Sequence, residues 1–405
     1  MSRGYSTLDR RQLLRIFGAL TAAGVTGSLA AACGADSDDG LQLSGLTIRI
    51  GLVVPSSGPY ARIGADIERG FRLFLASNDN RLGPHNVDLR TADEGEDPES
   101  ALAAVTSLAN QGAVAIAGVA NPDALPMIAL EMQNRQLPLV NPHAAPGTLT
   151  NALFVWRVGA VLGDAGRAIA DFAIRQGSRA YILWDTTSVG AAEAEVFRIA
   201  FTDLGGTIVN DPNAVSSNAD YRTPGLDNLQ ARLAEADDLN AHTIFAAFAG
   251  DEARQVLEAY RASGLTIPLL GTPSLTETVD LAALGIELPE RVYTSMYYAP
   301  DLDNDANRRF VTEYHRTHGT QPSGYAMAAY DCGSVLSRAL SLVPGDPTGA
   351  QVNRALSQLG QIESPRGTWT FNINRSPQQK WYLRRLGYDG MVPANLLDTD
   401  LLVVG

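Results

Sequence analysis

Three short groups of residues carry side chains that could bind a metal ion or take part in catalysis. The segment 301–305 has aspartates at alternate positions, as a calcium loop does, but Ala306 stands where such a loop needs glycine. His315 and His318 lie one helical turn apart with no acidic or cysteine partner nearby in the sequence. Lys380 is the only lysine, which excludes lysine-based catalysis elsewhere. We therefore predict no metal ion, no cofactor and no enzymatic activity, although a catalytic triad assembled from distant residues stays open.

A cysteine near the N-terminus has the sequence context of a lipid-modified residue. The small residues of segment 29–32 directly precede Cys33, which is similar to a bacterial lipobox. In that motif a signal peptidase binds the small side chains, and the thiol then accepts a diacylglycerol. With Cys33 acylated, Cys332 is the only remaining thiol, so no internal disulfide is expected. Cys332 lies in an apolar helical stretch, where we expect it to be buried and unreactive.

The residues before Cys33 have the features of an export signal. The pair Arg10-Arg11 precedes an apolar run over residues 16–32 and is similar to the twin-arginine signal. The run is shorter and weaker than a membrane-spanning helix. We predict a signal peptide over 1–32 and a polar, flexible tether over 33–45. An uncleaved membrane anchor, and export by the general route, are the alternatives.

The composition describes a chain of more than one domain with an acidic surface. Its 405 residues are 45% hydrophobic and 19% charged, which fits two or three folded domains and neither a disordered nor a polytopic membrane protein. The formal net charge is −13. Because binding to the phosphate backbone needs dense lysine and arginine, we predict no nucleic-acid partner.

From residue 46 onward the chain alternates between apolar, β-branched runs and amphipathic helices. The run Thr47–Val54 predicts a buried strand, the segment 55–59 a turn, and the helical spacing of apolar residues over 61–77 a helix. A second alternating series occupies residues 162–270. Alternation of this kind predicts parallel sheets with helices on both faces. The predicted fold class is therefore α/β, with two doubly wound parallel-sheet lobes joined by a multi-strand hinge.

The change of pattern after the second series indicates that the chain passes between the two lobes more than once. We predict crossings near Arg157, Met296 and Phe371. The predicted domains are lobe I at 46–156, lobe II at 157–295, lobe I continued at 296–370 and lobe II continued at 371–405.

Four landmarks follow one another in a characteristic order along this part of the chain. They are Ile50-Gly51-Leu52 with Gly58-Pro59-Tyr60-Ala61, Ile116-Ala117-Gly118 with 137–142, Tyr330-Asp331, and Pro365-Arg366-Gly367. In this order they resemble the extracellular solute-binding proteins of ABC importers, of the branched-chain amino-acid type with a type I periplasmic binding fold. The resemblance implies two lobes that close on a small-molecule ligand, an ABC permease as partner, and an extracytoplasmic, lipid-anchored location.

The resemblance also implies where a ligand would bind, and several of those positions depart from the family's pattern. Pro122, His143 and Ala145 stand where amino-acid-binding members have a serine, a small residue and a threonine. Val189 replaces an aromatic residue, and Pro273 lies where an acidic residue meets the α-ammonium. Each hydrogen bond to a charged group contributes about 1.5–3 kcal/mol. These departures therefore imply a small ligand other than a branched-chain amino acid.

We expect the ligand in a cleft beyond the carboxyl ends of the strands, where open α/β sheets bind their ligands. The residues predicted to contact it are Ser57, Tyr60, Asn121, Pro122, His143, Ala145, Thr187, Val189, Phe248 and Thr272. Purely structural roles stay open for the turn that contains Ser57 and for packing of His143 against its strand. The predicted function is capture of a small solute, an amino acid or a related small molecule, for an ABC importer. The alternatives are a ligand sensor with the same fold and, least favoured, an extracytoplasmic enzyme.

Overall fold

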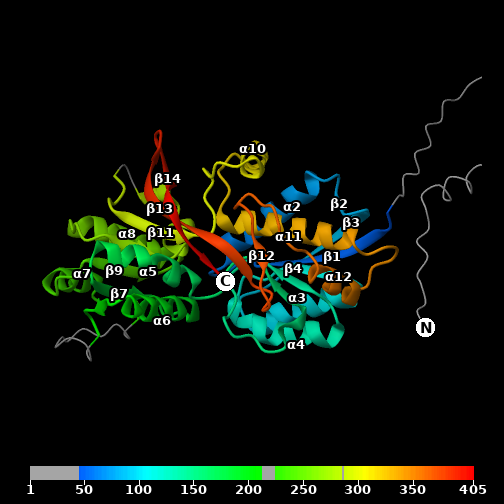
Figure 1. Cartoon of the computed structure of the whole chain (residues 1–405), viewed down its shortest axis with the longest axis horizontal. Coiled ribbons are helices and arrows are strands. Elements are labelled where there is room, and N and C mark those ends of the chain that lie inside the picture. The colour runs from blue at the N-terminus through cyan, green and yellow to red at the C-terminus, as the bar shows by residue number, and fades with distance from the viewer. Residues whose placement is uncertain (1–44, 212–223, 285–286) are drawn as a thin grey trace, which may run out of the picture. The chain divides into compact units, whose positions relative to one another are not determined.

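The structure, a computed structural model, is shown in Figure 1 and describes residues 45–211, 224–284 and 287–405. Residues 44–405 form one compact unit. The predicted signal peptide (1–32), the predicted lipidation at Cys33 and all but the last residue of the predicted tether (33–45) lie outside the described residues. Within the described ranges, no helix combines the length and apolarity needed to span a bilayer.

The first sheet has six strands in the order β2-β3-β1-β4-β5-β6. Its strands are β1 (Thr47–Val54), β2 (Arg81–Leu82), β3 (His85–Asp93), β4 (Ala115–Gly118), β5 (Leu139–Asn141) and β6 (Val155–Arg157). All neighbours pair in parallel except β2 with β3. Ile50 and Leu52 are fully buried, as expected for a parallel sheet covered on both faces. The predicted bounds of β1 are confirmed.

The second sheet has eight strands, with β12-β13-β11-β10-β9-β7-β8 in order and β14 paired to β13. Its strands are β7 (Arg179–Trp184), β8 (Thr207–Ile208), β9 (Thr243–Ala247), β10 (Leu269–Gly271), β11 (Val292–Met296), β12 (Thr370–Phe371), β13 (Pro377–Asp389) and β14 (Val392–Val404). The pairs from β8 to β11 are parallel, whereas β13 is antiparallel to each of β11, β12 and β14. The strands β7 to β10 form the predicted second doubly wound unit, and the parallel strand β11 was not predicted.

Helices connect successive strands of the two sheets. They are α2 (Ala61–Ala76), α3 (Pro98–Asn110), α4 (Leu125–Arg135), α5 (Asp164–Gln176), α6 (Ser188–Asp203), α7 (Leu229–Asp238), α8 (Gly250–Ser263), α9 (Ser274–Glu277), α10 (Asp305–His318), α11 (Gly324–Ser341) and α12 (Gly349–Leu356), with the 3₁₀ turns η1 (Pro122–Ala124), η2 (Ala152–Phe154) and η3 (Leu281–Leu284). Several begin at residues whose side chains cap the first turn. Asp97, for example, accepts a 2.7 Å hydrogen bond from Ser100 N at the start of α3.

After β11 the chain returns to the first sheet, where α11 lies beside α2 (Figure 1). The two helices meet at Gly70, where a Cβ would lie 1.9 Å from the carbonyl oxygen of Ala326. Only glycine permits this approach. Residues of β1, α2 and α11 share one hydrophobic core, which also buries Cys332. The prediction that Cys332 is buried is confirmed, and burial raises the pKa of its thiol well above the ordinary value.

A buried ion pair joins segments that lie far apart in the sequence. Arg366 donates from Nε and Nη2 to Asp331 Oδ2 at 2.9 and 2.6 Å, and both side chains are 1% exposed. Arg366 Nη1 donates to the carbonyl oxygen of Val158 at 2.9 Å, and Gln379 Nε2 donates to that of Gly159 at 2.8 Å. The pair therefore links α11, the stretch after β6 and β13. Asp331 and Arg366 belong to two of the sequence landmarks, which are thus direct partners.

The predicted fold class, α/β with parallel-sheet lobes, is confirmed, whereas the C-terminal region was only partly predicted. Residues 381–387 were expected to form a strand, and β13 is longer. Strand β14 was not predicted, because Asp398 and Asp400 interrupt its apolar pattern. Antiparallel pairing with β13 satisfies its backbone. The limits of the lobes at 156/157, 295/296 and 370/371 stay predictions.

Candidate functional site

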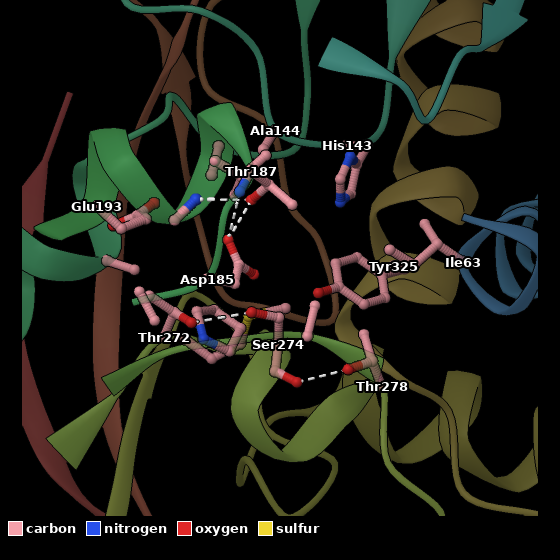
Figure 2. Close-up of a pocket in the computed structure, with 18 of the residues that line it drawn as sticks. Ile63, His143, Ala144, Asp185, Thr187, Glu193, Thr272, Ser274, Thr278 and Tyr325 are labelled. Carbon is pink, nitrogen blue, oxygen red and sulfur yellow. Dashed lines mark hydrogen bonds between the residues drawn. The ribbon is translucent and has the colours of Figure 1, made fainter. Parts of the chain in front are cut away.

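A largely enclosed cavity of about 140 Å³ lies at the carboxyl ends of strands from both sheets. The segments that follow β1, β5 and β6 line it from the first sheet, and those that follow β7, β9 and β10 line it from the second. This is the position expected for a ligand site in open α/β sheets. Figure 2 shows the cavity with Asp185, His143 and Tyr325 around the open space.

The lining is mostly apolar with a few polar groups, as in small-molecule sites generally. Its residues are Pro59, Tyr60, Ile63, His143, Ala144, Ala160, Ala165, Asp185, Thr187, Val189, Gly190, Glu193, Ala247, Ala249, Thr272, Pro273, Ser274, Thr278, Met296, Tyr297, Tyr325 and Trp381. Among these lining residues there are two carboxylates and no arginine or lysine. Of the ten predicted contact residues, Tyr60, His143, Thr187, Val189 and Thr272 line this cavity. That they contact a ligand stays a prediction.

Phe248 and Ala145 were predicted to contact the ligand, but neither lines the cavity. Ala247 and Ala249 line it, while the Phe248 side chain packs in the core of the second sheet. Successive residues of extended chain point to opposite sides, so the prediction missed by one position. Ala145 is likewise fully buried, in a core of the first sheet, next to the lining residue Ala144.

Ser57, Asn121 and Pro122 also lie outside the cavity lining. Ser57 is exposed in the turn between β1 and α2, two residues before the lining residue Pro59. Asn121 caps η1, where its side chain accepts a 3.0 Å hydrogen bond from Asp123 N, and Pro122 begins that turn. These two residues after β4 therefore shape the turn itself and do not line the cavity.

His143 is held in one tautomer by the backbone. Its Nδ1 lies 2.7 Å from the carbonyl oxygen of Ala120, and a carbonyl only accepts, so Nδ1 carries the proton. Burial lowers the pKa of the ring to about 4, which leaves Nε2 as an acceptor at neutral pH. The ring packs edge-on against Tyr60 and Tyr325, at centroid distances of 6.0 and 5.2 Å.

Asp185 follows β7 directly and is 5% exposed. Its Oδ1 accepts hydrogen bonds from Thr187 N at 2.9 Å and from Thr187 Oγ1 (Figure 2). Thr187 Oγ1 in turn accepts from Gly190 N at 3.0 Å and so caps α6. Desolvation raises the pKa of Asp185. No described residue donates to its second oxygen.

Glu193, the other lining carboxylate, is committed to the scaffold. It accepts hydrogen bonds from Gly163 N at 2.9 Å and Gly166 N at 2.8 Å, at the start of α5. Complete burial raises the pKa of Glu193 to about 7. The side chain fixes α6 to α5 and has no free acceptor oxygen for a ligand's donor.

Glu94 in the first sheet is likewise committed to backbone N–H groups, although it is not a lining residue. Its two oxygens accept from Ala120 N and Asn121 N, both at 2.7 Å. Desolvation raises the pKa of Glu94 to about 7. Burial, with contributions from Asp123, Asp185 and Glu94, raises the pKa of Tyr60 to about 12.

The hydroxyl groups after β10 form a relay within the cavity wall. Ser274 Oγ donates to the carbonyl oxygen of Phe248 at 2.9 Å, so the 2.9 Å contact between Thr272 Oγ1 and Ser274 Oγ has Thr272 as donor. Thr278 Oγ1 donates to Ser274 O at 2.6 Å. These hydroxyls hold the loop rather than offering free donors to the cavity.

One hydrogen bond connects loops of the two sheets near the cavity. Ser188 Oγ, at the start of α6, donates to Asp123 Oδ1 of η1 at 2.8 Å. This is a direct contact between a loop of the first sheet and a helix of the second. It spans the two sides that would separate if the cavity opened.

Several lining residues were not predicted. Asp185 carried a usable signal, since it directly follows the predicted strand Ala180–Trp184 and strand ends carry ligand contacts. Tyr297, Tyr325 and Trp381 carried no such local signal. Long-range packing brings them to the cavity from the end of β11, from α11 and from β13, respectively. Within the described ranges, no group of three or more metal-ligating side chains is found.

Comparison with known proteins places this geometry among solute-binding proteins. Residues 47–390 match the profile of a family described as periplasmic binding protein. A relative from Brucella suis, named Leu/Ile/Val-binding protein homolog 6, is 27% identical over 351 residues, which are 84% of this chain and 87% of the relative.

Solved structures show the same similarity. A solute-binding protein of an ABC transporter from R. palustris, in complex with benzoate, is 27% identical with a TM-score of 0.74, covering 88% of this chain and 97% of that one. A leucine-binding protein from Thermotoga maritima shares the fold at 19% identity and a TM-score of 0.71, covering 87% and 98% of the two chains.

Proposed function

The chain belongs to the periplasmic binding protein family, and on that premise we propose that it captures a small solute in the cavity and presents it to the permease of an ABC importer. Its relatives are solute-binding proteins rather than enzymes. The observation that carries the proposal is the cavity itself, which is largely enclosed and lined from both sheets. A solute held there contacts both sides at once.

A solute that contacts both sides of the cavity couples its own binding to closure of the two sides. A solute that touches the segments after β5 and β7 favours the closed arrangement by its differential affinity for that state. The bond from Ser188 to Asp123 forms only when the two sides are together. A closed, loaded protein is then the form that a permease distinguishes from the empty one.

The size of the cavity supports a compact ligand. Its volume of about 140 Å³ is close to the roughly 150 Å³ of an apolar cavity that holds benzene. The relative in complex with benzoate shows that a single-ring molecule is within the range of this family. We propose a solute of about one ring in size rather than a branched-chain amino acid.

We also propose the lipid anchor. Family membership implies an extracytoplasmic location. The small residues before Cys33 and the polar residues after it support acylation at that cysteine, with the segment up to residue 45 as tether. The anchor would keep the binding unit near its permease.

Thermal unfolding of the purified protein against single-ring compounds, amides and amino acids tests solute capture. At 100 times its dissociation constant a ligand adds about 2.7 kcal/mol of stability. For about 360 folded residues the entropy of unfolding is about 0.75 kcal/mol/K, so Tm should rise by about 3–4 °C. If no compound in a broad set raises Tm, the proposal of solute capture is refuted.

Delivery is tested separately, with the permease and ATPase reconstituted in vesicles. The loaded protein should stimulate ATP hydrolysis more than the empty protein does. Equal stimulation by both forms would contradict import and favour the sensor alternative.

A further inference from the structure

Two acceptor atoms of the cavity lining have no donor among the described residues. Asp185 uses one carboxylate oxygen for Thr187, and no described residue donates to the other. His143 uses its only N–H for Ala120, so its second nitrogen offers a lone pair. Both residues are 5% exposed and both line the cavity (Figure 2). A buried acceptor without a donor is costly, and a ligand with N–H or O–H groups satisfies it.

The cavity is surrounded by carboxyl groups rather than by basic side chains. Asp185 and Glu193 line it, and Asp123 and Glu94 act with Asp185 on Tyr60. None of the residues lining it is a lysine or arginine.

Two of the three buried arginines among the described residues are neutralised by ion pairs, and the third, Arg157, is not a lining residue. Arg384 pairs with Glu277, and Arg366 pairs with Asp331. Among the described residues around the cavity, neither of these side chains leaves an uncompensated positive charge for a ligand's carboxylate.

The backbone donors that would otherwise receive an anion are also occupied. The N–H groups after β4 donate to Glu94, and those at the start of α5 donate to Glu193. At the start of α6, the N–H groups of Thr187 and Gly190 donate to side chains of Asp185 and Thr187. The protein's own oxygens thus occupy several of the backbone donors at helix ends and strand ends, where anions commonly bind.

We infer that the site takes a small organic monocation, about one ring in size, whose ammonium group donates to Asp185 and whose body packs against the aromatic and apolar lining. This inference rests on the proposed function and names the chemical class of its solute. His143 Nε2 accepts a further hydrogen bond from the same group or from a hydroxyl. Tyr60 and Tyr325 bring aromatic rings to the cavity lining, and a cation is attracted to the face of such a ring. The two free acceptors and the absence of lysine and arginine from the lining disfavour a carboxylate.

Calorimetry with molecules of one size and different charge tests the inference. The probes are benzylamine, which is protonated at neutral pH, benzyl alcohol, benzoate and leucine. We expect benzylamine to bind at least about tenfold more tightly than benzyl alcohol, because a charged hydrogen bond contributes about 1.5–3 kcal/mol. Benzoate and leucine should bind more weakly still. Tighter binding of benzoate or leucine than of benzylamine, equal binding of benzylamine and benzyl alcohol, or binding of none of the four overturns the inference.

Two variants assign the preference to one side chain. Asp185→Asn keeps an oxygen for Thr187 and removes the charge, and it should reduce the preference for benzylamine over benzyl alcohol to less than about threefold. Asp203→Asn removes an exposed charge at the other end of α6 and should leave the preference unchanged. A preference retained in Asp185→Asn, or lost equally in both variants, contradicts the assignment. The wild-type series stands even if Asp185→Asn fails to fold.

The failure of this inference is distinguishable from failure of the proposed function. If an uncharged or anionic compound raises Tm in the broad screen while benzylamine does not, solute capture stands and the inference that the solute is a cation is refuted. If no compound of any charge raises Tm, solute capture itself is wrong.

Discussion

The buried ion pair between Arg366 and Asp331 gives the sharpest prediction about stability. Arg366→Met keeps most of the apolar stem and removes the guanidinium. Asp331 is then left as a buried carboxylate without its ionic partner, and it keeps the 2.7 Å hydrogen bond from Ser364 Oγ. The variant also loses the hydrogen bond to Val158 O and the stacking of the guanidinium on Trp369, 4.5 Å from the ring centroid. Removing one partner of a buried pair costs about 3–5 kcal/mol.

The assay is thermal and urea unfolding of wild type and variant. With an unfolding entropy of about 0.75 kcal/mol/K, Tm should fall by about 4–7 °C. The matched control is Arg316→Met, which breaks the ion pair with Glu313. Those side chains are 70% and 44% exposed, and an exposed pair contributes about 0–1 kcal/mol. A loss of stability below about 1 kcal/mol in Arg366→Met, or equal losses in both variants, would refute the view that this pair stabilises the fold by linking α11, the stretch after β6 and β13.

Three further predictions concern the cavity wall, its titration and the membrane anchor. In Gly190→Ala the new Cβ would lie 2.2 Å from Asp185 Oδ1, so calorimetry should show binding of benzylamine weakened at least tenfold, with about 1–3 kcal/mol of lost stability from overpacking; unchanged binding would contradict the placement of Asp185. The pKa of Glu94, raised from 4.5 to about 7, means that the folded state binds more protons than the unfolded state between these values. The contribution of this pKa shift to the stability of the folded state is fully present below pH 4.5 and is lost as pH rises through 7. Urea unfolding should therefore show Glu94→Gln gaining up to about 3 kcal/mol relative to wild type between pH 4.5 and 7.5, and a pH-independent difference would count against it. Cys33→Ser should abolish incorporation of labelled fatty acid and release the protein from the membrane fraction; retention of both would rule out acylation at this cysteine.

The sequence was most informative where one local pattern decides the structure. The apolar, β-branched run Thr47–Val54 and the helical spacing after it predicted β1 and α2 closely, because burial on both faces of a parallel sheet leaves a continuous apolar run. The strand–helix alternation then predicted both doubly wound units. Strand β14 escaped this reasoning, since its partner strand rather than its own composition determines it.

The site was predicted only in part, for two physical reasons. At Phe248 and Ala145 the prediction named loops that line the cavity, but these two side chains pack in cores while adjacent residues line the cavity. Tyr325 and Trp381 come from segments far along the chain, and no local pattern indicates that they face the same space as Tyr60. Asp185 could have been predicted from its place directly after β7.

The claim that the cavity between the two sheets holds the solute is tested most directly by filling it. Val189→Trp places a large ring among the lining residues of α6, whereas Ile199→Trp makes a similarly large change at a 43% exposed position on the same helix. The measurement is calorimetric binding of whichever of benzylamine, benzyl alcohol, benzoate or leucine binds wild type best, with Tm as the check on folding. We expect Val189→Trp to remain folded and lose binding at least a hundredfold, while Ile199→Trp binds as wild type does. A folded Val189→Trp that binds with wild-type affinity would show that the solute lies elsewhere.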